Sequence, residues 1–253
     1  MPEKVSSKRW EIAQDSEREY WQDFTKETLL RDEAERHEKK AKIIEEEWKK
    51  FIKLSKNSKI LQIGCGPEDV INYISKGKKY AIDPLANFYK EKFGLNYNLI
   101  SFSEARAEGL PFKDNDFDLV ILANVLDHVE YPEKAISEVK RVLKKDGVFH
   151  FENLFYQKNF IKLAKIFGII KRTLTGDIFN IHHPFMFKLK ELKKILSKDF
   201  SIIHEEIGRD IGSCDNIEEM KKMKKKEKKF TVRTLAKFGL YGTINYSAIC
   251  KKK

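Results

Sequence analysis

The chain has 253 residues, of which 41% are hydrophobic, so it can bury one large core with additions but not several full domains. No stretch reaches the roughly 18 uninterrupted apolar residues of a transmembrane helix, and residues 1–14 lack the apolar run of a secretion signal, which together predict a cytoplasmic protein. The three cysteines are an odd number without a CxxC pair, which argues against a disulfide framework and a zinc site.

The net charge of +11 is concentrated near one end of the chain. Residues 221–253 hold 12 Lys or Arg and one acid, Glu227, so this segment accounts for the whole excess and the rest of the chain is balanced. The charge therefore says little about the main body. We favour a solvated lysine-rich segment, with an anionic partner such as RNA as the alternative.

Residues 1–55 are predicted to form a helical extension. They are densely charged but also carry Trp10, Tyr20 and Trp21, and such aromatic side chains need a surface to cover. From residue 32 onward apolar residues recur three or four positions apart, as in an amphipathic helix that packs by one face. We expect two or more helices against the body, anchored by these aromatics, with closure over a substrate as the alternative.

A different pattern begins at Lys59, where short apolar segments alternate with helical ones. The predicted strands are KILQIG (59–64), KKYAID (78–83), NLISFS (98–103), FDLVILANVL (117–126) and GVFHFENLF (147–155), and the predicted helices lie at 70–75, 87–94 and 132–143. A turn is expected at 144–147. Alternating strands and helices, with two strands apolar throughout, indicate a parallel sheet covered on both faces.

The alternation stops after Tyr156. Residues 157–176 have the pattern of a basic amphipathic helix that does not lead directly into a strand, so we assign 157–186 as a cap insertion. A lid packed on the body is favoured over contact with a membrane surface. A helix at 188–197, a strand at 200–208, a lysine-rich insertion at 209–238 and a last strand near 240–250 complete a domain of residues 56–253.

The segment ILQIGCGPED places a glycine turn at the end of a buried strand. Gly64 and Gly66 permit positive φ and a close approach of a ligand to the main chain, and a following helix would offer free N–H groups. Asp83 ends the next strand, where a carboxylate can accept hydrogen bonds from ribose hydroxyls. Asp69 stands where a dinucleotide fingerprint has glycine and would repel pyrophosphate, which favours a cationic nucleoside without phosphate.

Four phrases between residues 59 and 152 resemble the class I S-adenosylmethionine-dependent methyltransferases, in particular the type 11 branch. They are ILQIGCGP, YAIDP, ARAEGLPFKDNDFDLV and NVLDHVEYPEKAISEVKRVLKKDGVF. The resemblance implies an α/β, Rossmann-like three-layer sandwich with a mostly parallel seven-stranded sheet and an antiparallel last strand. It also implies S-adenosylmethionine as the cofactor and methyl transfer as the reaction.

The same resemblance assigns candidate site residues. Those expected to bind the cofactor are Gly64, Cys65, Gly66, Asp83, Pro84, Arg106, Ala107, Glu108 and Asn124. The acceptor pocket is expected to include Asp127, His128, His182 and His183, and the aromatics Trp10, Tyr20 and Trp21 are candidates to close over it. Gln62, Glu68 and Arg106 depart from the family pattern, and Glu68 is a candidate for the negative charge that Gln62 lacks.

Methyl transfer from a sulfonium is an in-line displacement, in which the protein chiefly orients the reactants and excludes water. No fixed catalytic dyad is therefore expected, although a hydroxyl or carbon acceptor benefits from a general base. His128 is the first candidate, with simple packing as the alternative. His182 and His183 are adjacent and no third ligand is evident, so no metal site is predicted.

The leading hypothesis is a methyltransferase that acts on a small molecule. One alternative is an RNA methyltransferase that grips phosphates with its lysine-rich segment. The other is a non-catalytic protein of the same fold that holds the cofactor or nothing.

Overall fold

The computed structural model describes residues 5–94, 99–175, 183–208 and 243–253, and only the backbone of residues 31–33. The predicted lysine-rich insertion and His182 lie outside the described residues, as does Cys214. Cys65 and Cys250 are buried free thiols.

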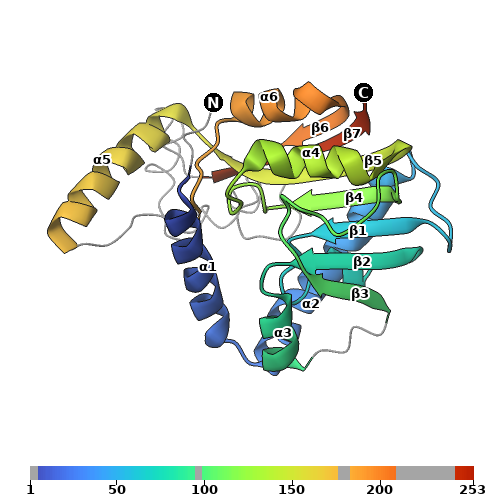
Figure 1. Ribbon diagram of the computed structural model, residues 1–253, viewed down its shortest axis with the longest axis horizontal. Coiled ribbons are helices and arrows are strands. Elements are labelled where there is room, and N and C mark those ends of the chain that lie inside the picture. Colours follow the sequence, from blue (N-terminus) through green and yellow to red (C-terminus); the bar gives the residue numbers. More distant parts are fainter. Residues whose placement is uncertain (1–4, 95–98, 176–182, 209–242) are drawn as a thin grey trace, which may run out of the picture.

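The described strands form one seven-stranded sheet in the order β3-β2-β1-β4-β5-β7-β6 (Figure 1). The strands are β1 (Lys59–Ile63), β2 (Lys78–Asp83), β3 (Ile100–Glu104), β4 (Phe117–Ala123), β5 (Leu143–Tyr156), β6 (Phe200–Ile207) and β7 (Thr243–Lys252). β1 to β5 run parallel, and β7 is antiparallel to both β5 and β6. This confirms the predicted sheet. The strand order reverses between β1 and β4, which is where open α/β sheets form a ligand crevice.

Six α-helices are described around the sheet. They are α1 (Ser7–Gln22), α2 (Lys26–Trp48), α3 (Ala86–Phe93), α4 (Pro132–Val142), α5 (Lys158–Thr175) and α6 (Leu189–Asp199). Local chemistry fixes several ends: Ser6 accepts a hydrogen bond from the Arg9 N–H at the start of α1, and Thr25 forms a capping box with Thr28 at the start of α2. The two predicted N-terminal helices are therefore present.

Apolar side chains on the two faces of the sheet form two separate cores. One face packs under α4 and α6, whose buried residues include Ile136, Val139 and Leu196. The other packs under α2 and α3, with Ile44 and Trp48 of α2 fully buried against the sheet. The result is the predicted three-layer sandwich.

The helix predicted at 70–75 is wrong in type. The structure has a single 3-10 turn there, η1 (Val70–Asn72), begun by the Asp69 side chain, which accepts from the Val70 N–H. The chain then passes through Gly77 at φ +101° into β2. The buried face of α2 covers this part of the sheet instead, against η1. The turn predicted at 144–147 lies within β5.

Candidate functional site

A cavity of about 270 Å³ opens where β1, β2 and β4 end. Its walls come from the loop 63–69, the loop 83–85, residues 105, 107 and 108, residues 123–125, 128 and 129, and side chains of α1, α2, α3, β5 and β7. The carboxyl ends of parallel strands meet at one edge of the sheet, so residues far apart in sequence converge here. Pro84 and Asn124 line this cavity as predicted.

The glycine loop presents bare main chain to the cavity. Gly64 has φ +65° and Gly66 has φ +58°, in the left-handed region that favours glycine. A Cβ on Gly64 would lie 2.3 Å from Cγ2 of Val125, so this glycine is required by packing. A Cβ on Gly66 would meet no atom within 4 Å, so this residue faces open space into which a ligand can approach its backbone. Cys65, between them, is buried and lines the same cavity.

Asp83 points its carboxylate at the glycine loop. Its Oδ2 accepts from the Gly66 N–H at 3.0 Å and its Oδ1 accepts from the Leu85 N–H at 2.9 Å. Burial raises the pKa of this carboxyl to about 6, although the two backbone donors oppose the shift. Each carboxylate oxygen keeps a second lone pair, so ribose hydroxyls can still be accepted here.

Carboxylates outnumber fixed cations among the described residues of the cavity wall. The acids there are Glu17, Glu68, Asp69, Asp83, Glu108 and Glu152, and the described lysines and arginines are Lys40 and Arg36. A wall with this excess of negative charge attracts a cationic ligand and disfavours a phosphate.

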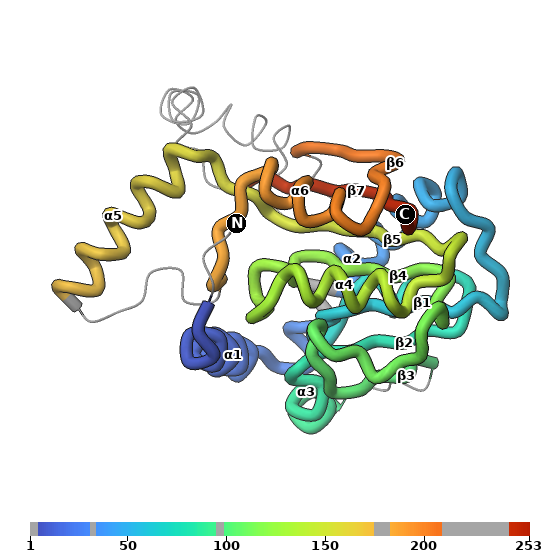
Figure 2. The backbone as a smooth tube through the Cα atoms, turned by 45° about the horizontal axis from the view of Figure 1, so that its top comes forward, coloured from blue at the N-terminus to red at the C-terminus, as the bar shows by residue number. Residues whose placement is uncertain are grey.

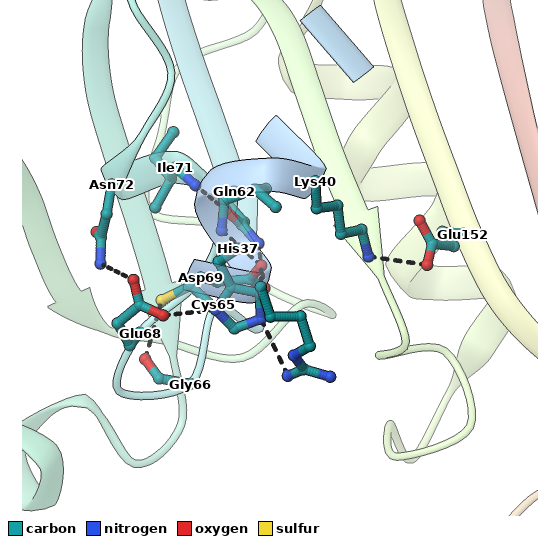
Figure 3. A network of polar contacts seen from close by, with 12 residues as sticks. His37, Lys40, Gln62, Cys65, Gly66, Glu68, Asp69, Ile71, Asn72 and Glu152 are labelled. Carbon is teal, nitrogen blue, oxygen red and sulfur yellow. Dashed lines mark hydrogen bonds and ion pairs between the residues drawn. The ribbon is translucent and has the colours of Figure 1, made fainter. Parts of the chain in front are cut away.

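A polar network connects α2 to the glycine loop and to β5 (Figure 3). His37 Nδ1 lies 2.5 Å from Oε2 of Glu68, and Lys40 donates to Oε1 of Glu152 at 2.8 Å. Neither basic residue is among those predicted from the sequence, because charged side chains of an amphipathic helix ordinarily face solvent. A signal was present: His37 and Lys40 are in helical phase with the buried Ile44 and Trp48.

Gln62 and Glu68 hold the loop that follows β1. Gln62 donates to Oδ2 of Asp69 at 2.5 Å and accepts from the Ile71 N–H at 3.0 Å. Glu68 accepts from Asn72 and pairs with His37, as Figure 3 shows. The carboxylate of Glu68 is thus committed to protein partners, although Glu68 and Asp69 both line the cavity.

Arg106, which is predicted to lie beside adenine, is not among the residues that line the cavity. Its guanidinium sits 3.8 Å from the ring centroid of Trp10 and pairs with Oε2 of Glu130 at 2.7 Å. Ser7 donates to the other oxygen of Glu130 at 2.6 Å. Arg106 therefore fastens α1 to the body, while its neighbours Ala107 and Glu108 line the cavity as expected.

Glu108 shapes the cavity wall through the main chain. Its Oε1 accepts from the backbone N–H groups of Glu130 and Tyr131, at 2.8 and 3.2 Å. These bonds position the turn that leads into α4.

α1 supplies one side of the cavity. Trp10 and Trp21 line it, and Trp21 packs edge-on against Tyr89 and Phe93 of α3. Tyr20 is half exposed and is not among the described residues that line the cavity; its ring packs against Trp21 and Phe24. No described residue of α5 lines the cavity either, so α1 takes the closing position that was expected of residues 157–176.

Three of the predicted acceptor residues come together at the end of β4. Oδ2 of Asp127 lies 2.8 Å from Nδ1 of His183, and the rings of His128 and His183 are 4.4 Å apart. Of the three, His128 lines the cavity. An aspartate–histidine pair was not expected from the sequence, because residues 127 and 183 are far apart in the chain.

Asp127 and His183 shift each other's titration. Burial would raise the pKa of Asp127, but the adjacent His128 and His183 hold it below its usual range. Burial would likewise lower the pKa of His183, but the Asp127 carboxylate raises it. The pair therefore favours an imidazolium beside a carboxylate.

The side-chain atoms of Asp127, His128 and His183 that could bind a metal ion lie within 4.8 Å of one another. The fold thus places three residues of metal-ligating type together, which the sequence did not predict. The Asp127–His183 hydrogen bond, however, occupies one oxygen and one nitrogen that a metal would need. The two side chains therefore form a charge-assisted hydrogen bond.

Comparison with known proteins shows which family this part of the chain matches. Residues 61–151, from β1 into β5, match the type 11 family described as "Methyltransferase domain". The chain carries a type 11 methyltransferase domain. The matched part contains the glycine loop, Asp83, Asp127 and His128. The family is S-adenosylmethionine-dependent.

Relatives of this methyltransferase domain have diverse names. The ubiquinone/menaquinone biosynthesis C-methyltransferase UbiE of Rickettsia felis is 29% identical over 182 residues, which cover 64% of this chain and 72% of that one. The probable methyltransferase ltbC of Aspergillus luteorubrus is 32% identical, over 53% of this chain and 55% of its own. The uncharacterised protein MJ0638 of Methanocaldococcus jannaschii is also 32% identical, over 58% and 60%. The chain thus spans less than two thirds of the length of the latter two relatives.

Solved structures share the fold of the methyltransferase domain at low sequence identity. A putative sarcosine dimethylglycine methyltransferase from Galdieria sulphuraria superimposes with a TM-score of 0.59 at 16% identity, over 83% of this chain and 84% of that one. Geranyl diphosphate C-methyltransferase from Streptomyces coelicolor gives 0.58 at 10% identity, over 84% and 78%. These likenesses concern the fold.

Proposed function

We propose that the chain transfers a methyl group from S-adenosylmethionine to a small-molecule acceptor. The observation that carries this proposal is the bare main chain of Gly66 beside the Asp83 carboxylate, in a cavity whose wall is rich in acids. S-Adenosylmethionine is a nucleoside with a positive charge and no phosphate, so it suits this wall. When bound, it supplies a methyl group carried on a sulfonium sulfur, which leaves as a neutral thioether when the methyl group is transferred.

Each part of the wall then has a role in holding the cofactor. Gly64, Cys65 and Gly66 offer main chain to its methionine half. Asp83 accepts from the ribose hydroxyls, with Pro84 beside it. Ala107 and Glu108 flank adenine, and Asn124 lies between cofactor and acceptor. All of these residues line the same cavity, which supports their assignment to one ligand.

At the acceptor end, His128 accepts the proton that the acceptor loses. Asp127 and His183 are positioning residues, because the buried carboxylate stabilises positive charge on the two imidazoles. A hydroxyl or an activated carbon needs such a base, whereas a neutral amine attacks without one. The name of the relative UbiE, a C-methyltransferase, supports a carbon acceptor as one of these two.

Isothermal titration with S-adenosylmethionine and its demethylated product tests the cofactor part of the proposal. Binding of both is expected, and binding of neither would end it. Release of demethylated product in the presence of phenols, hydroquinones and amines tests the acceptor part. Turnover with amines alone would contradict the role given to His128.

A further inference from the structure

α5 leaves much of its apolar surface uncovered. In Figures 1 and 2 the helix extends away from the sheet as an arm. Leu163, Ile166, Ile170 and Leu174 are 51%, 56%, 49% and 78% exposed. Their spacing of three and four residues puts them on one face of the helix, so they form a continuous apolar stripe.

The start of the helix packs on the body. Ile161 and Ala164 are buried, and the ring of Phe160 stacks on Tyr156 at 5.7 Å. A contiguous stripe of large aliphatic side chains on a solvent-exposed surface marks an interaction site.

The charge of α5 selects among possible occupants. Residues 158–175 contain four Lys and one Arg and no acid. Lys158, Lys162 and Lys165 recur at helical spacing: Lys162 flanks the apolar stripe, and Lys158 and Lys165 lie farther round the helix from it. A second copy of this helix would bring the same five positive charges close to these, which is unfavourable. An anionic lipid surface supplies both the opposite charge and an apolar layer.

We propose that α5 docks this protein on an anionic lipid bilayer. The apolar stripe enters the boundary of the acyl chains, and the basic residues remain at the level of the lipid phosphates. None of the described helices has the length and apolarity to cross a bilayer, so α5 lies in the interface. This docking is independent of the acceptor and of methyl transfer.

Co-sedimentation of the full chain with vesicles tests the docking. The chain should bind vesicles of phosphatidylcholine mixed with phosphatidylglycerol more strongly than vesicles of phosphatidylcholine alone. This binding should weaken as the salt concentration is raised. The variant Ile166→Glu/Ile170→Glu should bind about tenfold or more weakly, because it places two charges in the stripe. The matched control Ile43→Glu/Ile203→Glu makes the same exchanges at exposed positions of α2 and β6 and should bind as the parent does.

Three results would overturn the proposal. The first is no binding to either kind of vesicle. The second is binding that the α5 variant leaves unchanged, which would locate it at other lysines of the chain. The third is an oligomer of the parent protein, seen by sedimentation velocity without lipid, that the α5 variant no longer forms. The apolar stripe would then be covered by a second copy of the chain. Circular dichroism and titration with the demethylated cofactor confirm that each variant is folded, so loss of vesicle binding is distinct from loss of the cofactor site.

Discussion

At the scale of single residues, Asp83 joins β2 to the glycine loop. Because its carboxylate is the expected partner of the ribose hydroxyls, Asp83→Ala should weaken binding of the demethylated cofactor by about 1 to 3 kcal/mol, or roughly 5- to 150-fold. Isothermal titration measures this. Glu104→Ala is the matched control, since Glu104 ends β3 in register with Asp83 but is exposed and does not line the cavity. Unchanged affinity in the Asp83 variant would contradict its role.

The raised pKa of Asp83, about 6, makes cofactor binding sensitive to pH. Burial disfavours the charged form, so the contribution of this carboxyl to folding stability falls as pH rises from about 4 to 6. Ribose hydroxyls donate best to the ionised form, and affinity for the demethylated cofactor should therefore fall by up to about fivefold between pH 6 and 5. Titrations at a series of pH values check this, and Asp83→Asn should remove the dependence.

His128 should matter for turnover and little for cofactor binding. His128→Gln should lower kcat by about 10²- to 10⁴-fold, the usual contribution of a general base, with affinity for the demethylated cofactor nearly unchanged. The measurement uses whichever acceptor supports product release.

Asp127→Asn provides a second readout of the same group. Removing the carboxylate lowers the pKa of the neighbouring imidazoles, so the acid limb of the kcat profile should move to lower pH. A purely structural role for Asp127 would lower the amount of folded protein without moving that limb.

At the scale of elements, α2 is held to β5 by a buried ion pair. The Glu152 carboxyl would have a raised pKa from burial alone, but Lys40 and His150 hold it at about 2. This depressed pKa adds stability above the pKa of the unfolded carboxyl, and the stability is lost as pH falls toward 2. Lys40→Met should destabilise the fold by about 3–5 kcal/mol, because it leaves a buried charge unpaired.

Chemical denaturation measures the effect of Lys40→Met. The double variant Lys40→Met/Glu152→Gln should recover most of the loss. Lys39→Met is the matched control: Lys39 pairs with Glu35 on the exposed side of the same helix, so its loss should leave the free energy of unfolding nearly unchanged. Equal effects of the two single variants would show that the buried pair adds nothing.

At the scale of the whole molecule, the N-terminal helices complete a site that the sheet only begins. Trp10, Gln14, Glu17 and Trp21 of α1 line the cavity. The hydrogen bond from Ser7 to Glu130 and the ion pair of Glu130 with Arg106 hold this helix beside the cavity. A chain that lacks residues 1–22 should keep its sheet, seen by circular dichroism. It should bind the demethylated cofactor about tenfold or more weakly, because one wall of the cavity is gone. Trp10→Ala should shift the affinity in the same direction by less.

The sequence by itself determined the alternation of strands and helices, the glycine loop with Asp83 one strand away, and the family. These features depend on local periodicity, on glycine at positive φ and on short motifs, which neighbouring residues encode.

Only the tertiary structure decided what covers the sheet and what faces the cavity. It replaced the first crossover helix by η1 under α2, turned His37 and Lys40 inward, drew Arg106 onto Trp10, and brought Asp127 to His183. These contacts join residues from distant parts of the chain. Their energies depend on burial and on the partner, which no local pattern records.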